Sequence, residues 1–244
     1  MRNVKIVFEY DGAAYYGLQK QENVRTIQGE IERALNNLTG EHIESVVAGR
    51  TDKGVHAMNQ VMNFFTNTKI PTEKIAQILN KRLPEDIKIK SSEEVDEEFN
   101  ARFSAKSRRY VYIMRNQKYR NVFEEKYITF IKDDIIVENF VEMLNPLCGK
   151  HDFDSFRKSD CSAHSPVREI KSIEMTNENG YYKFYIEADG FLKSMVRIIV
   201  GSGLAVYFGE KDKDYILRNV ENPAKNGEKI VAPPNGLYLY EVKY

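Results

Sequence analysis

The chain has 244 residues, of which 42% are hydrophobic and 30% are charged, a composition typical of a folded globular protein and not of a disordered one. Lys+Arg and Asp+Glu both total 36, so the formal net charge of zero neither requires nor excludes an anionic partner. Two cysteines argue against a disulfide-stapled secreted fold, and no N-terminal signal pattern or membrane-spanning apolar run is visible. Together these features predict a cytoplasmic protein with reduced thiols.

The first half of the chain alternates predicted strands and helices. Residues 3–10 are rich in β-formers that alternate in polarity, which predicts a strand. Residues 26–38 place apolar side chains on one helical face, with Thr26 as the expected N-cap and Gly40 as the stop. The remaining predictions are strands at 44–49, 60–67, 87–95 and 99–105 and a helix at 71–84.

The second half repeats this alternation without repeating the sequence. "NENG" separates two runs of β-formers and predicts a hairpin over 168–190. The other expected elements are strands at 108–116 and 236–244 and helices at 133–144, 191–209 and 212–220. Interleaved helices and hairpins predict an α+β fold with helices on one face of the sheet. We expect a boundary near 105, dividing the chain into 1–105 and 106–244, either as independent lobes or as halves of one continuous sheet.

The segment "AGRTDKGVHA", residues 48–57, places one carboxylate among cations. Arg50 and Lys53 flank Asp52, and glycines on both sides make the segment pliable. An ionised carboxylate in this setting can act as a nucleophile, as a general base or as the anchor of a cation. The competing interpretation is a salt-bridged turn, and the local sequence taken alone favours that interpretation because short motifs often match by accident.

A basic, acid-free block, residues 101–120, contains the strand "RRYVYI". Alternation places Tyr110 and Tyr112 on the same face of this strand. A tyrosine beside Arg108 and Arg109 can stack on a base while the arginines bind phosphates. The alternative, which the strand taken alone favours, is an aromatic ring that packs in a half-buried sheet.

Two further arginines stand in unusual surroundings. Arg197 interrupts the apolar stretch "MVRIIVG", where a buried charge usually requires a carboxylate partner. If the helix is only half buried, Arg197 instead extends to solvent. Arg157 lies in "FDSFRKSD" and is a further candidate for binding an anionic ligand.

Cofactor and metal signals are weak. Two C-x2-H pairs together offer four zinc-type ligands, namely Cys148, His151, Cys161 and His164. No zinc-finger framework surrounds them, so we expect no metal. The phosphate-binding and dinucleotide-binding motifs, HExxH and GxSxG are all missing from the sequence. The sequence therefore predicts no cofactor.

Seven motifs, taken in order, resemble the TruA family of tRNA pseudouridine synthases. They are "YDGAAYYGLQKQ", "TIQGEIERAL", "AGRTDKGVHA", "ARFSAKSRRYVYI", "HDFDSFRKSD", "FLKSMVRIIVG" and "APPNGLYLYEVKY". The resemblance runs from Tyr10 to Tyr244, and its most specific part is Gly49 to His56. It implies two lobes related to RNA-recognition folds, a shared and largely antiparallel sheet, and a central basic cleft. It also implies a homodimer that isomerises uridines 38, 39 and 40 of the tRNA anticodon stem-loop without metal or cofactor.

Roles for individual residues follow from the matching motifs. The resemblance implies that Asp52 is the catalytic aspartate, that Tyr110 stacks on the target uracil and that Arg197 pairs with Asp52. It also implies that Arg50 helps to extrude or hold the flipped nucleotide and that Leu237 packs beneath the base. We expect Arg108, Arg109 and Arg157 to be further substrate-binding residues.

Isomerisation also agrees with the missing cofactor motifs, because nothing is oxidised or transferred to a second molecule. Whether the carboxylate attacks the sugar or assists elimination stays open. The sequence departs from the family where Leu18 replaces a frequent Trp and where Lys53 replaces a frequent Ala. Two other interpretations are a non-catalytic RNA-binding module, disfavoured because Asp52, Tyr110 and Arg197 are all present, and an aspartate-dependent hydrolase, which lacks a second carboxylate or a metal cluster.

Overall fold

The computed structural model describes all 244 residues, which form two compact units. The first unit contains Met1–Lys106 and Tyr238–Tyr244, and the second contains Ser107–Leu237. Each unit is taken by itself below. The C-terminal residues of the chain belong to the first unit, a feature that a single boundary at 105 does not include.

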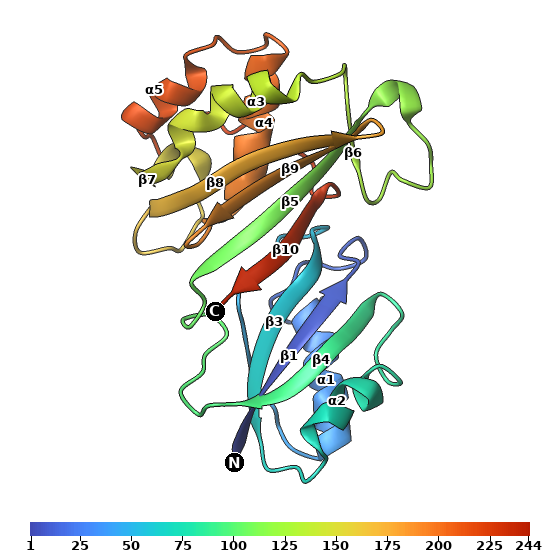
Figure 1. Cartoon of the computed structure of the whole chain (residues 1–244). Helices are drawn as coiled ribbons and strands as arrows, with labels where there is room; N and C mark the ends of the chain where they lie inside the picture. Colours follow the sequence, from blue (N-terminus) through green and yellow to red (C-terminus); the bar gives the residue numbers. More distant parts are fainter. The chain divides into compact units, whose positions relative to one another are not determined.

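The sheet of the first unit is built around β1 (Arg2–Tyr10), which lies between β3 (His56–Thr66) and β4 (Ile87–Val95) and is antiparallel to both (Figure 1). Two shorter pairings extend β3, with β2 (Ser45–Val47) antiparallel and β10 (Leu237–Lys243) parallel to it. One face of β1 is fully apolar and buried; its side chains are Val4, Ile6, Phe8 and Tyr10. The predicted alternation of this strand is confirmed.

Helix α1 (Ile27–Thr39) begins and ends at its predicted caps. The Oγ1 atom of Thr26 accepts a hydrogen bond from the backbone N–H of Gly29, and Gly40 closes the helix with a left-handed φ of 72°. Helix α2 (Thr72–Leu79) ends before the predicted position. The side chain of Asn80 both donates to and accepts from the backbone of Ile89 in β4, at 2.8 Å each, and thereby ends the helix at its C-cap.

The strand predicted at 99–105 is wrong, because this segment forms a turn. The Oδ1 atom of Asn100 accepts hydrogen bonds from the backbone N–H groups of Arg102 and Phe103, at 3.0 and 3.1 Å. The backbone N–H of Ala101 donates to Asn63 at 2.8 Å instead of to a neighbouring strand. An asparagine side chain that satisfies its own following backbone replaces strand pairing with a local turn.

Four strands of the second unit pair in the order β5-β9-β8-β7. Its members are β5 (Ser107–Asn116), β9 (Tyr181–Ala188), β8 (Val167–Glu178) and β7 (Gly149–Asp152), each antiparallel to its neighbour. A short strand, β6 (Thr129–Ile131), pairs parallel with β5. The predicted hairpin is β8 and β9, and both turn residues, Asn179 and Gly180, have positive φ angles of 55° and 81°.

Three helices complete the second unit: α3 (Val137–Leu144), α4 (Met195–Tyr207) and α5 (Tyr215–Glu221) (Figure 1). The buried ring of Phe140 in α3 meets Phe184 of β9 edge-on at 6.0 Å, so α3 covers the apolar face of this sheet. Helix α4 starts four residues later than predicted, because Ser194 adopts a left-handed φ of 59° that a helix cannot contain. Three single turns of 3₁₀ helix are also present, at Gln117–Tyr119, Asn145–Leu147 and Asp154–Phe156.

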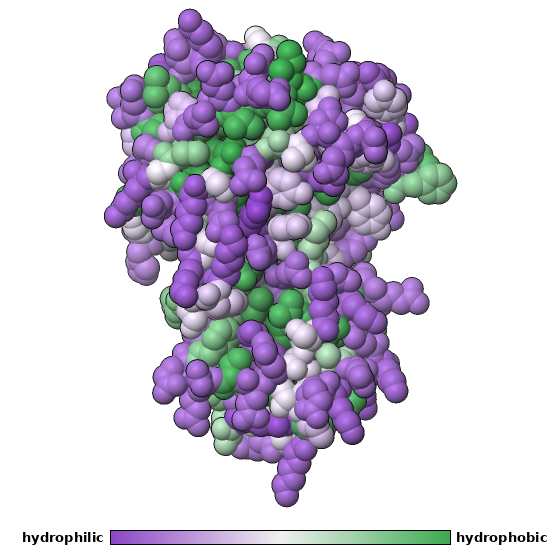
Figure 2. Space-filling view, in the orientation of Figure 1, coloured by the Kyte–Doolittle hydropathy of each residue, from purple (hydrophilic) through white to green (hydrophobic).

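The predicted α+β class with mostly antiparallel pairing is confirmed in both units. Hydrophilic side chains cover most of the face of the protein drawn in Figure 2, as expected when apolar strand faces are turned inward. None of the helices has the length and apolar character that crossing a membrane demands.

Candidate active site

Asp52 lies in a tight turn between β2 and β3. The backbone N–H of Val55 donates to the carbonyl oxygen of Asp52 at 3.1 Å, which closes a four-residue turn. Gly54, the third residue of the turn, has a φ of 77°, a conformation that favours glycine. The Asp52 side chain is partly exposed, whereas Lys53 at the second position is exposed to solvent. The turn therefore presents a carboxylate and an ammonium group side by side.

A buried hydrogen bond supports this turn from beneath. The hydroxyl groups of Tyr10 and Thr51 lie 2.7 Å apart in the interior. Burial raises the pKa of Tyr10 to about 12, while its hydrogen bonds to Thr51 and Gln60 act in the opposite direction. The tyrosine thus stays protonated and neutral under the turn. The last residue of β1 and the residue before Asp52 are thereby joined.

Two glycines of the segment 11–18 lie directly against the turn. A side chain at Gly12 would overlap the carbonyl group of Val55, and one at Gly17 would come within 2.8 Å of the carbonyl oxygen of Thr51. Gly17 also has a φ of 105°, and the N–H of Leu18 donates to Thr51 at 3.2 Å. Only glycine allows this close backbone approach, so the backbone of the "YDGAAYYGLQ" motif packs directly against the Asp52 turn.

His56 connects the same segment to β10 within the first unit. Its ring is 1% exposed, and its Nδ1 atom lies 3.1 Å from the backbone nitrogen of Gly12, which donates to it. The same Nδ1 atom lies 3.2 Å from a carboxylate oxygen of Asp11. The ring stacks on Tyr238 with centroids 4.7 Å apart. The histidine of the motif therefore fixes the backbone after Asp52 and is buried away from solvent.

Arg50 and Lys53, the two cations beside Asp52, form no ion pair with it. Arg50 is exposed and makes no hydrogen bond or ion pair. The ammonium group of Lys53 lies 4.1 Å from the centre of the Tyr16 ring, a cation–π contact worth about 0.5–1 kcal/mol at an exposed site. Neither flanking cation therefore supplies the salt bridge that the local sequence favoured.

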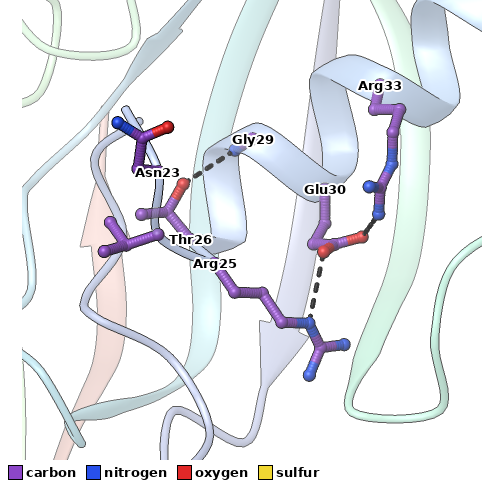
Figure 3. Close-up of a pocket in the computed structure, with 7 residues that line it drawn as sticks. Asn23, Arg25, Thr26, Gly29, Glu30 and Arg33 are labelled. Carbon is purple, nitrogen blue, oxygen red and sulfur yellow. Dashed lines mark hydrogen bonds and ion pairs between the residues drawn. The ribbon is translucent and has the colours of Figure 1, made fainter. Parts of the chain in front are cut away.

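A pocket at the start of α1 shows the opposite arrangement (Figure 3). Its two cations, Arg25 and Arg33, both bond to the carboxylate of Glu30, with Arg25 Nε at 3.2 Å. Arg25 also pairs with Asp86 at 3.4 Å and lies over the ring of Tyr15 at 4.4 Å. Its positive charges are already neutralised by the protein, so this pocket is a poor candidate for binding an anion.

Tyr110 lies on β5 in the second unit, in register with Ile186 of β9. Its ring is 6% exposed and meets the Phe191 ring edge-on at 5.1 Å. Tyr112 lies on the same face two residues later, as predicted, and is fully buried. Its hydroxyl group lies 2.7 Å from that of Thr129.

Arg108 and Arg109 are consecutive on β5, so their side chains leave opposite faces of the strand. Arg108 Nη1 donates to the carbonyl oxygen of Asp189 at 2.9 Å. Arg109 pairs with Glu174 at 3.0 Å and lies over the Tyr185 ring at 4.7 Å. Other cations of the acid-free block also have carboxylate partners from elsewhere in the chain: Arg115 with Glu124, Lys118 with Asp134, and Arg120 with Glu125.

Arg197 projects from α4 toward the segment that precedes β10. Its Nε atom donates to the carbonyl oxygen of Ala232 at 2.8 Å, and the N–H of Ala232 donates back to the carbonyl oxygen of Arg197 at 3.0 Å. Leu237, the first residue of β10, follows this segment and is 5% exposed. Gly236 accepts a hydrogen bond from Ile113 of β5 at 2.8 Å. Within this unit β5, α4 and the residues before β10 are thus tied together.

Arg157 is buried, with its side chain 8% exposed and paired with Asp154 at 2.5 Å. Its Nη1 atom lies 3.4 Å from the carbonyl oxygen of Ala163. The histidine of the first C-x2-H pair, His151, bonds the carbonyl oxygen of its own Cys148 at 2.8 Å. The structure contains no group of three or more His, Cys, Asp or Glu side chains that could hold a metal ion.

Comparison with known proteins identifies the family to which the chain belongs. A family model described as tRNA pseudouridine synthase matches residues 6–104 and 143–244, most of the chain. The chain is 43% identical over 244 residues to tRNA pseudouridine synthase A of Acetivibrio thermocellus, covering 100% of both proteins. It belongs to the TruA family.

Other TruA family members are similar over the same length. The enzyme of Caldicellulosiruptor saccharolyticus is 41% identical and that of Thermoanaerobacter sp. strain X514 is 40% identical, each with 100% of both chains covered. A solved Cbf5-Nop10-Gar1 complex contains a chain with a TM-score of 0.37 and 10% identity, covering 85% of this chain and 54% of that one. A similarity this weak carries no argument.

The residues expected in the TruA site are divided between the units. Asp52 and Arg50 lie in the first unit; the second contains Tyr110, Arg197, Leu237, Arg108, Arg109 and Arg157. Sequence reasoning missed Tyr16, Gly12 and Gly17, which surround the Asp52 turn. The only available signal was two glycines inside a motif rich in tyrosine, and no local pattern indicated that their partner was a segment some forty residues away.

Proposed function

We propose that this TruA family protein isomerises uridine to pseudouridine at positions 38, 39 and 40 of the tRNA anticodon stem-loop. The observation that carries the proposal is the family match over the full chain, which includes the Asp52 turn. In that turn a partly exposed carboxylate lies between two cations that have no ion pairs. An anionic nucleic acid is the ligand class that such a pair of cations favours.

The reaction requires only groups that a protein side chain can supply. The bond between N1 of uracil and C1′ of ribose breaks, the ring turns, and a bond between C5 and C1′ forms. C5 then loses its proton, and N1, which carried none while bonded to C1′, gains one, so no oxidant, reductant or co-substrate takes part. We assign the carboxylate role to Asp52, either as the nucleophile at C1′ or as the base that assists elimination of the uracil.

Two residues of the second unit complete the proposed catalytic set. Tyr110 is the residue that stacks on the extruded uracil, and Arg197 is the arginine that supports the catalytic carboxylate. A uridine must leave its stack before it can react, at a cost of a few kcal/mol, and an aromatic ring offsets part of that cost. The edge contact of Tyr110 with Phe191 supports this role, because it fixes the ring plane before RNA binds.

The proposed RNA-binding residues differ in their exposure and in their partners within the protein. Arg50 is exposed and without partner, which supports a direct role in holding the extruded nucleotide. Arg108 donates to a neutral carbonyl group and Arg109 pairs with Glu174, and we propose that both bind backbone phosphates when RNA is present, from opposite sides of β5. Arg157 is buried with Asp154, which favours a role in holding its own loop for the RNA. Leu237 is the apolar residue proposed to lie beneath the base.

We further propose that the protein acts as a homodimer in the cytoplasm, where its tRNA substrate is found. The dimer proposal rests on family membership, and light scattering on the purified protein tests it directly. A mass of about 57 kDa, twice the 28.3 kDa of one chain, is expected.

The test of the proposed function is single-nucleotide mapping of pseudouridine in unmodified tRNA after incubation with the purified protein. We expect modification at one or more of positions 38 to 40. Asp52→Ala is expected to lower the rate by about 10³-fold or more while RNA affinity stays within a few-fold. Tight tRNA binding without any pseudouridine would favour a non-catalytic RNA-binding module. A substantially active Asp52→Ala variant would remove Asp52 from its role.

A further inference from the structure

We propose that Lys53, held over the ring of Tyr16, binds a phosphate that flanks the target nucleotide. The inference rests on the proposed function, because it assigns a specific RNA contact to a residue beside the catalytic carboxylate. Tyr16 is the corresponding positioning residue, which acts through Lys53.

The first support is the free charge of Lys53. Its ammonium group contacts the face of an aromatic ring and no carboxylate, so the positive charge is not neutralised within the protein. Lys20, four residues after Tyr16, is the contrasting case, since its ammonium group pairs with the buried Glu32 at 3.0 Å. A compact ammonium group that keeps its charge and its exposure is suited to bind phosphate as a point charge.

The second support is the fixed position of the ring. The backbone N–H of Tyr16 donates to the carbonyl oxygen of Arg25 at 3.0 Å. On the other side, Gly17 and Leu18 lie against the carbonyl oxygen of Thr51. Tyr16 is 54% exposed, so its backbone is fixed by hydrogen bonds while its side chain stays accessible to solvent. A lysine on such a ring has less freedom to lose when it binds a ligand.

The third support is the distance from Lys53 to the reacting sugar. Consecutive Cα atoms are about 3.8 Å apart, so Lys53 starts within one residue of the carboxylate that acts at C1′. The second position of the turn directs its side chain outward. The ribose of the target nucleotide carries a phosphate on each side, and these are the anions nearest to its C1′ atom. Lys53 is therefore close enough to bind one of these two phosphates.

Salt dependence of RNA binding tests the proposal without relying on turnover. Each phosphate contact contributes about 0.7 to 0.9 to the slope of log affinity against log salt concentration. We expect Lys53→Ala to lower the slope by about that amount, so that its affinity deficit shrinks about threefold between roughly 50 and 200 mM salt. Lys53→Arg is expected to keep the slope. Lys74→Ala, an exposed lysine on α2, is the matched control and is expected to leave the slope unchanged.

A double-mutant cycle tests the positioning role of Tyr16. Tyr16→Phe keeps the ring and is expected to behave like the wild type, whereas Tyr16→Leu is expected to show part of the Lys53→Ala effect. Combined with Lys53→Ala, Tyr16→Leu is expected to add nothing, because both changes remove one interaction. In turnover assays the effect is expected in KM and not in kcat.

An unchanged salt slope in Lys53→Ala would overturn the proposal. If Tyr16→Leu changes RNA affinity by the same factor in the wild-type protein and in the Lys53→Ala variant, the positioning role of Tyr16 would be overturned. A wild-type protein that binds tRNA but forms no pseudouridine would overturn the proposed function, while the slope would still decide whether Lys53 contacts phosphate. A wild-type protein that binds no RNA would overturn both.

Discussion

Two pairs of cations in the first unit lie in similar polar settings but are used differently. Arg25 and Arg33, at the start of α1, share the carboxylate of Glu30 (Figure 3). Arg50 and Lys53, beside Asp52, have no carboxylate partner at all. The first pair is part of the scaffold, because its charges are satisfied within the protein. The second pair is not neutralised by the protein and is the pair that we propose to bind RNA.

The backbone around the two pairs also differs in how closely it is packed. The Asp52 turn is supported by a buried Tyr10–Thr51 hydrogen bond and by glycines that leave no room for a side chain. At the α1 pocket, a side chain at Gly29 would meet mainly the Thr26 side chain, at 2.9 Å. The site whose cations are unpaired thus has the more closely packed backbone, as expected where the geometry must be ready before the ligand binds.

The largest expected effect comes from Gly12→Ala. The added methyl group would overlap the carbonyl group of Val55, and neither backbone can move without breaking the Asp52 turn. We expect a loss of about 3 kcal/mol or more in the free energy of unfolding, together with loss of isomerisation. Gly29→Ala in the α1 pocket is the matched control, measured by urea unfolding and tRNA turnover.

For Gly29→Ala we expect a change in stability below about 1 kcal/mol and full activity, because lost capping is offset by the helix propensity of alanine. Equal losses in the two variants would show that the rigid support of the Asp52 turn has been misidentified.

A smaller effect is expected from the proton buried under the turn. The folded pKa of Tyr10 is raised to about 12 from 10.0, so its contribution to stability is complete below pH 10. It is lost as pH rises from 10 through 12, because the unfolded chain releases this proton first. The loss reaches about 3 kcal/mol when complete and about 1 kcal/mol at pH 11.

Tyr10→Phe removes this dependence while leaving the other tyrosines in place. Urea unfolding of both proteins at pH 8, 10 and 11 isolates the Tyr10 contribution. If the stability difference between them stays constant from pH 8 to pH 11, the tyrosine is not buried as a neutral group beneath Asp52.

The smallest effect concerns the cations themselves. Arg50→Ala is expected to raise KM for tRNA about tenfold, which corresponds to about 1.4 kcal/mol, because it removes an unpaired cation that is proposed to contact RNA. Arg33→Ala removes a paired cation and is expected to leave KM within twofold. Steady-state kinetics at low salt compares them, and similar increases in KM would erase the distinction between the two pairs.

Local patterns predicted most of the elements and some of their ends. Thr26 and Gly40 bound α1 as expected, and the Asn179–Gly180 turn forms the expected hairpin. These predictions succeeded because capping and turn chemistry act within a few residues of sequence. The strand expected at 99–105 failed for a related reason, since Asn100 satisfies its own local backbone and replaces the pairing that β-propensity alone suggested.

The surroundings of the candidate site were less accessible to sequence reasoning. The block 101–120 contains no acid, and we expected its cations to contact phosphates, but Arg109, Arg115, Lys118 and Arg120 are paired with carboxylates from other segments. Conversely, the local sequence around Asp52 taken alone favoured a salt-bridged turn, but neither Arg50 nor Lys53 pairs with Asp52. Whether a charge is available depends on partners distant in sequence, and so does the contact between Gly12 and Val55.

The most direct test of the central claim is tritium release from tRNA labelled at C5 of its uridines. Forming the C5–C1′ bond expels the hydrogen at C5, so each isomerisation releases one tritium to water. We predict release by the wild-type protein that saturates near the number of modified uridines, and release at background level by Asp52→Asn. Equal release by the two proteins, or none by the wild type despite tRNA binding, would contradict the assignment of Asp52 as the catalytic group of a tRNA uridine isomerase.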